Sequence, residues 1–290
     1  MIAFSRQLRS VNLSQCYCLS SQVLRPLVTM PANQLQTLIL YGCGKMDSQL
    51  MVDIIHRHST TLQCIRLTDI NDAIMEAIGL CRSLRDLGLE HCASLSNAAL
   101  TRYFQSCRQL THLRMRDISH LSSHHVRCVA ESSKTLHHFD MSECNGVNSS
   151  DGFFCLATEC TSLDTLLLAY QTGVTNQAMQ LFLSHCHSLK HVDVSGCRLL
   201  TDQAFLSNHV SLETLNISGL DLLTSDSIQQ LLTRLGSLKE LCLGVTYDLD
   251  EADRILNIIN QEQCKFFIDT ERCYTICRTP IHTRELDIPP

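Results

Sequence analysis

A nine-residue phrase, Leu-x-x-Leu-x-Leu-x-x-Cys, recurs along almost the whole of this 290-residue chain. Successive copies open every 26 residues on average, about the period at which a chain folds as an array of stacked units. Ten intervals of such regularity exclude a chance match. In chain order, the opening positions are Leu8, Leu35, Leu62, Leu84, Leu110, Leu136, Leu163, Leu189, Leu212, Leu238 and, with the leucine replaced, Cys264.

Each copy of the phrase predicts a strand followed by a helix. Apolar alternation, as in Leu87-Gly88-Leu89, is typical of a short strand with one buried face. After the phrase comes a turn, where Thr201 or Asp202 is placed to cap a helix, and the pattern recurs at Thr175 and Thr224. One unit cannot bury its own apolar face. We therefore expect an α/β solenoid of about ten units, with a parallel sheet on the concave side and helices outside.

Nine of the 17 cysteines fall into two registers of the repeat. Five end the phrase, and four stand three residues before the next opening leucine, where the helix ends. A small, weakly polar thiol tolerates burial there and can donate to a loop carbonyl within the stack. The first set is Cys16, Cys43, Cys92, Cys144 and Cys197, and the second is Cys81, Cys107, Cys160 and Cys186.

With this doubled cysteine register, residues 8 to 270 resemble the cysteine-containing leucine-rich repeats of F-box/leucine-rich-repeat proteins and of the antagonist of mitotic exit network protein. The resemblance implies a horseshoe-shaped solenoid that recognises other proteins and is not an enzyme. F-box proteins also carry an N-terminal three-helix segment that docks the adaptor of a cullin ubiquitin ligase. Its Leu-Pro start is not visible here, and the repeat begins by Leu8. We therefore expect adaptor binding only if an F-box lies outside this chain.

Two units of the repeat are irregular. The units that open at Leu62 and Leu189 are short, and the Leu62 phrase ends in Ile70 in place of cysteine, so we expect a local change of curvature. At the other end, residues 264–268 predict a last apolar strand that caps the solenoid. The domain boundaries are accordingly 1–270 for the capped solenoid and 271–290 for a polar C-terminal tail.

Charge and cysteine count limit the partners and the compartment. With 23 Lys and Arg against 29 Asp and Glu, the net charge of −6 does not favour nucleic acid as a partner. No signal peptide and no membrane-spanning apolar run is visible, so we expect no membrane partner. An odd number of cysteines in a long chain without a signal favours reduced thiols in the cytoplasm or the nucleus.

Two cysteine–histidine groupings have residue types suited to zinc. Neither has the paired C-x-x-C spacing of established zinc sites, so we predict no metal and no cofactor. The groupings are Cys273 and Cys277 with His282, and His185, Cys186 and His187 with His191.

A hydrolase triad is the other enzymatic alternative. His138, Asp140 and Ser142 are the right residue types on one strand face, but same-face neighbours lie about 6.6 Å apart with parallel side chains. The same types recur at His191, Asp193 and Ser195, which favours a pattern inherited from the repeat. We predict no enzyme. A Cys/His hydrolase or metal enzyme remains the alternative from another functional class.

The solvent-facing positions of the third to sixth strands predict a compact patch of mixed charge. A mutually compensated surface and a partner-binding site are equally open interpretations. Three arginines on two strands favour a site for an acidic or phosphorylated segment, since Arg binds such groups through paired hydrogen bonds. The predicted site is Arg66, Asp86, Glu90, His112, Arg114, Arg116, His138 and Asp140.

The function predicted from the sequence is therefore that of a protein–protein interaction module. It resembles the substrate-recognition part of an SCF-type (cullin-RING) ubiquitin ligase receptor. The alternative within the same class is a free-standing regulator, like the mitotic exit antagonist, that sequesters a partner without a ligase.

Overall fold

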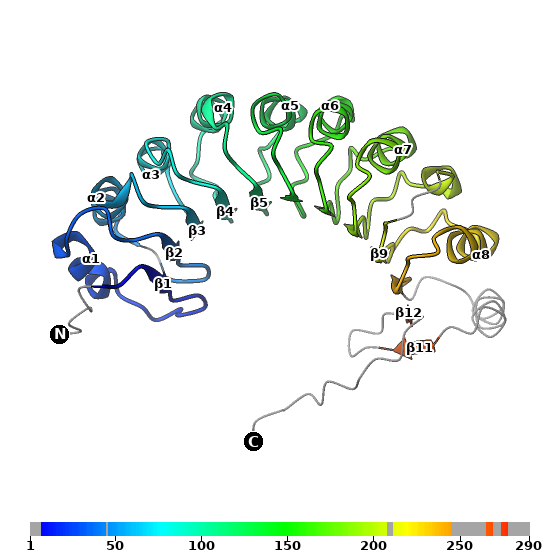
Figure 1. The fold of residues 1–290 in the computed structure, drawn as a ribbon, viewed down its shortest axis with the longest axis horizontal. Coiled ribbons are helices and arrows are strands. Elements are labelled where there is room, and N and C mark those ends of the chain that lie inside the picture. The colour runs from blue at the N-terminus through cyan, green and yellow to red at the C-terminus, as the bar shows by residue number, and fades with distance from the viewer. Residues whose placement is uncertain (1–6, 45, 208–210, 245–264, 269–273, 278–290) are drawn as a thin grey trace, which may run out of the picture.

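The computed structural model is an open arc of stacked units, with the strands on the inside and the helices on the outside (Figure 1). It describes residues 7–44, 46–207, 211–244, 265–268 and 274–277, the last two ranges by their backbone alone. The predicted solenoid, with its concave sheet and outer helices, is confirmed in this part of the chain.

Ten parallel strands pair in chain order, each with its neighbours in the sequence. The register keeps equivalent positions of the phrase level: Leu87 of β4 pairs with Ile65 of β3 and with Leu113 of β5. The strands are β1 (Ser10–Asn12), β2 (Thr37–Ile39), β3 (Cys64–Thr68), β4 (Asp86–Glu90), β5 (His112–Arg116), β6 (His138–Asp140), β7 (Thr165–Leu167), β8 (His191–Asp193), β9 (Thr214–Asn216) and β10 (Glu240–Cys242).

A helical segment lies in each crossover between these strands. As predicted, Thr175, Thr201 and Thr224 cap three of them by accepting a hydrogen bond from a backbone N–H in the first turn. The two short units have helical segments of only seven and four residues, α3 and η2, because fewer residues remain after the strand and its loops. The segments are η1 (Ser21–Leu24), α1 (Arg25–Thr29), α2 (Ser48–His58), α3 (Asp72–Ile78), α4 (Asn97–Ser106), α5 (Ser123–Ser132), α6 (Asp151–Glu159), α7 (Asn176–His185), η2 (Asp202–Phe205) and α8 (Ser225–Arg234).

The apolar positions of the phrase form one continuous core between the sheet and the helices. Leu84, Leu87 and Leu89 are buried, and the same cluster runs from Val11 in the first unit to Leu243 in the last described one. Since each unit covers the next, the sheet is held as a rigid platform along the arc.

Three of the cysteines at the end of the phrase join their unit to the one before it, whereas the thiol of Cys92 donates to Glu90 of its own unit over 3.3 Å. The thiols of Cys43, Cys144 and Cys197 donate to the carbonyls of Leu13, Met115 and Leu168, over 3.1, 3.1 and 3.0 Å. Each acceptor is the third leucine position of the preceding unit. The predicted bond from a thiol to a loop carbonyl is thus present at Cys43 and Cys197, whereas Cys144 donates to a carbonyl within β5.

In the seventh unit a glutamine replaces this cysteine. Gln171 is buried, and its Nε2 donates to the carbonyl of Met141 over 2.5 Å. The amide therefore makes the bond that the thiol makes elsewhere. Its Oε1 is buried without a partner.

Burial of the 14 described cysteines follows the stack. Seven are buried, whereas Cys16 and Cys18 are exposed because they lie in the first unit, where no described unit precedes them. All 14 are free thiols. Burial raises the pKa of Cys144 and of Cys197 to about 12, which leaves almost no reactive thiolate at neutral pH.

We therefore expect thiol titration of the native protein to label only a minority of the 17 cysteines. Cys16 and Cys18 should react first, and Cys92, Cys144 and Cys197 only after unfolding. Mass spectrometry of the labelled peptides measures the order. Complete labelling without denaturant would contradict the buried role, and stoichiometric zinc in elemental analysis would overturn the metal-free prediction.

At the C-terminal end of the sheet, the pairing turns antiparallel. β12 (Tyr274–Cys277) pairs with β10, and β11 (Lys265–Ile268) pairs with β12 at the edge. The capping strand predicted at residues 264–268 is present as β11, but β12 lies between it and the solenoid. β12 also falls within the segment predicted as tail. The rest of residues 271–290 lies outside the described part of the chain, so the boundary at 270 stays a prediction.

Candidate functional site

The eight residues of the predicted site lie on the inner face of four adjacent strands, β3 to β6. Gly88 pairs with Arg66 on one side and Arg114 on the other, and Arg114 pairs with Asp140. The sheet thus brings together side chains that are up to 74 positions apart in the sequence. Their position on the face follows from the period of two within each strand.

Arg66 and Arg114 share one carboxylate. The guanidinium of Arg66 donates to both oxygens of Asp86, over 2.6 and 3.3 Å, and that of Arg114 donates to Asp86 Oδ1 over 2.8 Å. All three side chains are largely buried, so these bonds are less screened by water than exposed ones. Asp86 therefore holds two arginines in fixed positions across three strands.

Arg116 is paired with a residue outside the predicted site, Glu143. Its guanidinium lies 3.0 Å from Glu143, and both side chains are about half exposed. Glu143 follows β6 in the loop, one position beyond the face residues that the period of two identifies. Every arginine of the predicted site thus has a carboxylate partner within the protein. Arginine number alone therefore does not distinguish a binding site from a compensated surface.

Two histidines stack in the middle of the face. The rings of His112 and His138 lie 5.8 Å apart and nearly parallel. Burial, together with the charge on Arg114 and the neighbouring His112, lowers the pKa of His138 to about 4, so this ring is neutral at pH 7. Its Nε2 is buried without a hydrogen-bond partner.

The triad-like residues do not form a catalytic relay. Asp140 is buried, which raises its pKa above the ordinary value, and Oδ1 accepts from the backbone N–H of Ser142 over 3.0 Å. In the equivalent set, Ser195 donates directly to Asp193 over 2.7 Å. Here the carboxylate binds the serine, whereas nucleophilic catalysis needs serine to contact the histidine.

Tyr41 of the second unit also belongs to this face, although the predicted site starts one unit later, at Arg66. Its hydroxyl lies where a side chain at position 88 would be, beside the Arg66 side chain. Gly88 therefore leaves room for the tyrosine to reach across β3. Burial raises the pKa of Tyr41 well above its ordinary value, which keeps the phenol neutral.

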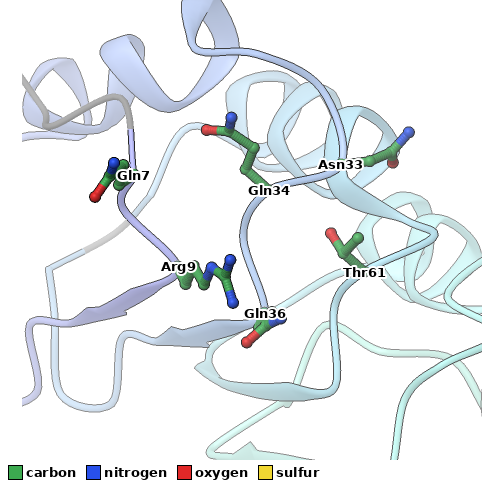
Figure 2. Close-up of a pocket in the computed structure, with 6 residues that line it drawn as sticks. All are labelled: Gln7, Arg9, Asn33, Gln34, Gln36 and Thr61. Carbon is green, nitrogen blue, oxygen red and sulfur yellow. The ribbon is translucent and has the colours of Figure 1, made fainter.

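A separate pocket of about 530 Å³ opens where the first strands begin. Figure 2 shows amide side chains around it, together with the guanidinium of Arg9. None of its six lining residues is acidic, and Gln34 Oε1 is buried without a partner. The lining residues are Gln7, Arg9, Asn33, Gln34, Gln36 and Thr61.

Two further features concern metal ions and membranes, within the described ranges. There, no group of three or more His, Cys, Asp or Glu residues is arranged to hold a metal ion. The zinc alternative at Cys273, Cys277 and His282 lies outside the described side chains. None of the described helices is both long and apolar enough to span a bilayer.

No protein-family model matches the sequence. Among solved structures, the arc is similar to a chain in the crystal structure of the Rad7 and Elc1 complex in yeast. The TM-score is 0.60 and the identity 17%, over 88% of this chain and 73% of that one. A leucine-rich-repeat-containing protein from Legionella pneumophila, LegL7, matches with a TM-score of 0.47 and 14% identity, over 87% and 89% of the two chains. With ten parallel strands and a helical segment in every crossover between them, this chain has the fold of a leucine-rich-repeat solenoid.

Proposed function

We propose that this protein is a non-enzymatic interaction module that binds a protein partner on the inner face of β3 to β6. The observation that carries the proposal is the Arg66–Asp86–Arg114 network, which fixes charged side chains on a rigid sheet before any partner arrives. Such preorganisation lowers the entropy that binding costs. The fold likeness to a chain crystallised in the Rad7 and Elc1 complex agrees with a protein partner.

The partner segment is proposed to be acidic or phosphorylated, and Arg116 is the residue best placed to accept it. Its pair with Glu143 is about half exposed, and such pairs contribute less than about 1 kcal/mol. A carboxylate or phosphate of the partner can therefore replace Glu143 at little cost. Arg114, fixed by Asp86, lies on the same strand and offers further N–H donors.

Within this class, the proposed role is substrate recognition for a cullin-RING ubiquitin ligase, in the cytoplasm or the nucleus. The resemblance of the cysteine-containing repeats supports it, and the free-standing regulator is the second candidate. Affinity purification from cells separates the two: a cullin and its adaptor accompany the protein in the first case and are absent in the second. Binding of a purified partner to the Arg114→Glu/Arg116→Glu variant tests the binding face itself.

A polypeptide of this sequence alone is expected not to bind the cullin adaptor directly, because its residues include no Leu-Pro start of an F-box and follow the repeat from Leu8 onward. A two-component binding assay with purified adaptor measures this. Micromolar or tighter binding would contradict the expectation, and an F-box protein of known adaptor affinity serves as the positive control.

A further inference from the structure

The loops that follow β5 to β8 form a groove of about 500 Å³ along the edge of the concave face. Two rows of loop residues border it, one from the eighth position of the phrase and one from two positions later. The first row is Asp117, Glu143, Tyr170 and Gly196, and the second is Asn145, Thr172 and Arg198, with Leu199 next to it. Four loops at the spacing of neighbouring strands give a length of about 14 Å, which fits about four residues of extended chain.

Tyr170 lies in this groove with a strained, left-handed backbone conformation. The eighth position of the phrase is left-handed in nine consecutive units, and the two units after Tyr170 place Gly196 and Gly219 there. Tyr170 adopts φ +59° with a full side chain, a conformation that costs free energy in any residue but glycine. Its ring lies where a Cβ of Gly196 would be, so the glycine in the next unit makes room for it.

The groove exposes apolar surface that the fold does not need. Tyr170 and Leu199 are 59% and 52% exposed, and Leu222, one unit further along, is 55% exposed. Leu199 and Leu222 hold the same position of successive units, and Tyr170 and Leu199 line the same groove. Exposed aromatic and aliphatic residues that cluster in this way are typical of a binding surface.

The charges of the groove are satisfied except at one end. Asp117 accepts from His91 Nδ1 over 2.5 Å, and Glu143 is paired with Arg116 over 3.0 Å. Arg198 makes no hydrogen bond or ion pair with any residue in the described ranges, and it stands beside Leu199. The charge without a partner in the described ranges is therefore positive, and it lies next to the exposed apolar side chain of Leu199.

We propose that this groove binds an extended segment of a partner protein in which a large apolar side chain adjoins an aspartate or glutamate. The apolar side chain packs between Tyr170 and Leu199, and the carboxylate pairs with the guanidinium of Arg198. The inference rests on the proposed function, since it concerns the same class of partner. It adds a second contact surface outside the predicted face. Glu143 connects this groove to that face through its ion pair with Arg116.

Selection of random peptides displayed on phage against the immobilised protein tests the groove. Enriched peptides should carry Phe, Leu, Ile or Met next to Asp or Glu. A synthetic peptide of the enriched sequence should bind Arg198→Glu and Tyr170→Gly at least about tenfold more weakly than the parent, the loss typical of a binding hot spot. Tyr17→Ala is the matched control, since Tyr17 is an exposed tyrosine of the first unit.

Tyr170→Gly separates binding from folding. Glycine relieves the left-handed backbone, so its melting temperature should not fall below that of the parent although binding is lost. The groove is wrong if no peptide is enriched, if the enriched peptides lack an acidic residue, or if they bind both groove variants like the parent. Suppose that the peptides bind both groove variants like the parent but bind Arg114→Glu more weakly. That result would contradict the groove proposal and leave the proposed function standing.

Discussion

Reversing the charge of Arg114 and Arg116 together is expected to weaken binding of a protein partner by several kcal/mol, because carboxylates of the protein and of an acidic partner would then face each other. Neither residue belongs to the leucine core, so the fold should persist. The local cost is larger at Arg114, where glutamate would stand against Asp86, the carboxylate that now lies 2.8 Å from the guanidinium. Isothermal titration with a partner found by purification measures the effect, and circular dichroism checks the fold.

Arg102→Glu is the matched control for this experiment. Arg102 is also paired with a carboxylate, Glu76 at 3.1 Å, but it lies on α4 at the outer side of the arc. It should lose its ion pair without losing the partner. If the Arg114→Glu/Arg116→Glu variant binds as well as the parent, the inner face is not the site, and the groove after β5 to β8 or the outer helices become better candidates.

Replacing His58 by leucine is expected to destabilise the protein by about 3 kcal/mol, since it leaves buried backbone groups unpaired. His58 ends α2 and is fully buried. Its Nε2 lies 3.0 Å from the carbonyl of Leu27, and its Nδ1 accepts from the backbone N–H groups of Gln34 and Leu35 over 3.3 and 3.5 Å. One ring thus joins α2 to α1 and to the loop before β2. Urea unfolding measures the loss.

The same histidine makes stability depend on pH. Burial lowers the pKa of His58 below its ordinary value, against the hydrogen bond to Leu27. As the pH falls, the unfolded state therefore takes up the proton before the folded state does. The stability that His58 contributes is complete above about pH 6.5 and is lost as the pH falls below that value. The difference in unfolding free energy between the parent and His58→Leu should shrink from pH 7 to pH 5. A difference that stays constant would contradict this, and His56→Leu, an exposed position of the same helix, is the control.

The sequence alone determined the parts of this protein that depend on local and nearest-unit packing. The period fixed which leucines are buried, and the threonines before three helical segments fixed where those segments begin. The cysteine register at Cys43 and Cys144 identified the bonds between neighbouring units. These features repeat because every unit covers the next in the same way, and a repeated contact leaves a repeated residue type.

Residue pairings within the candidate site were decided by the tertiary structure. The sequence placed Arg116 on the inner face but did not reveal Glu143 as its partner, since Glu143 leaves the period of two and enters a loop. Tyr41 reaches Gly88 across a strand, and the Tyr170 ring occupies the space of Gly196. His58 binds backbone groups of two other segments and carries no signal of this in its neighbours. Such contacts occur once, between side chains whose distance depends on strand register and loop length. A period records only what is repeated, so these single contacts became visible only when the strands were placed side by side.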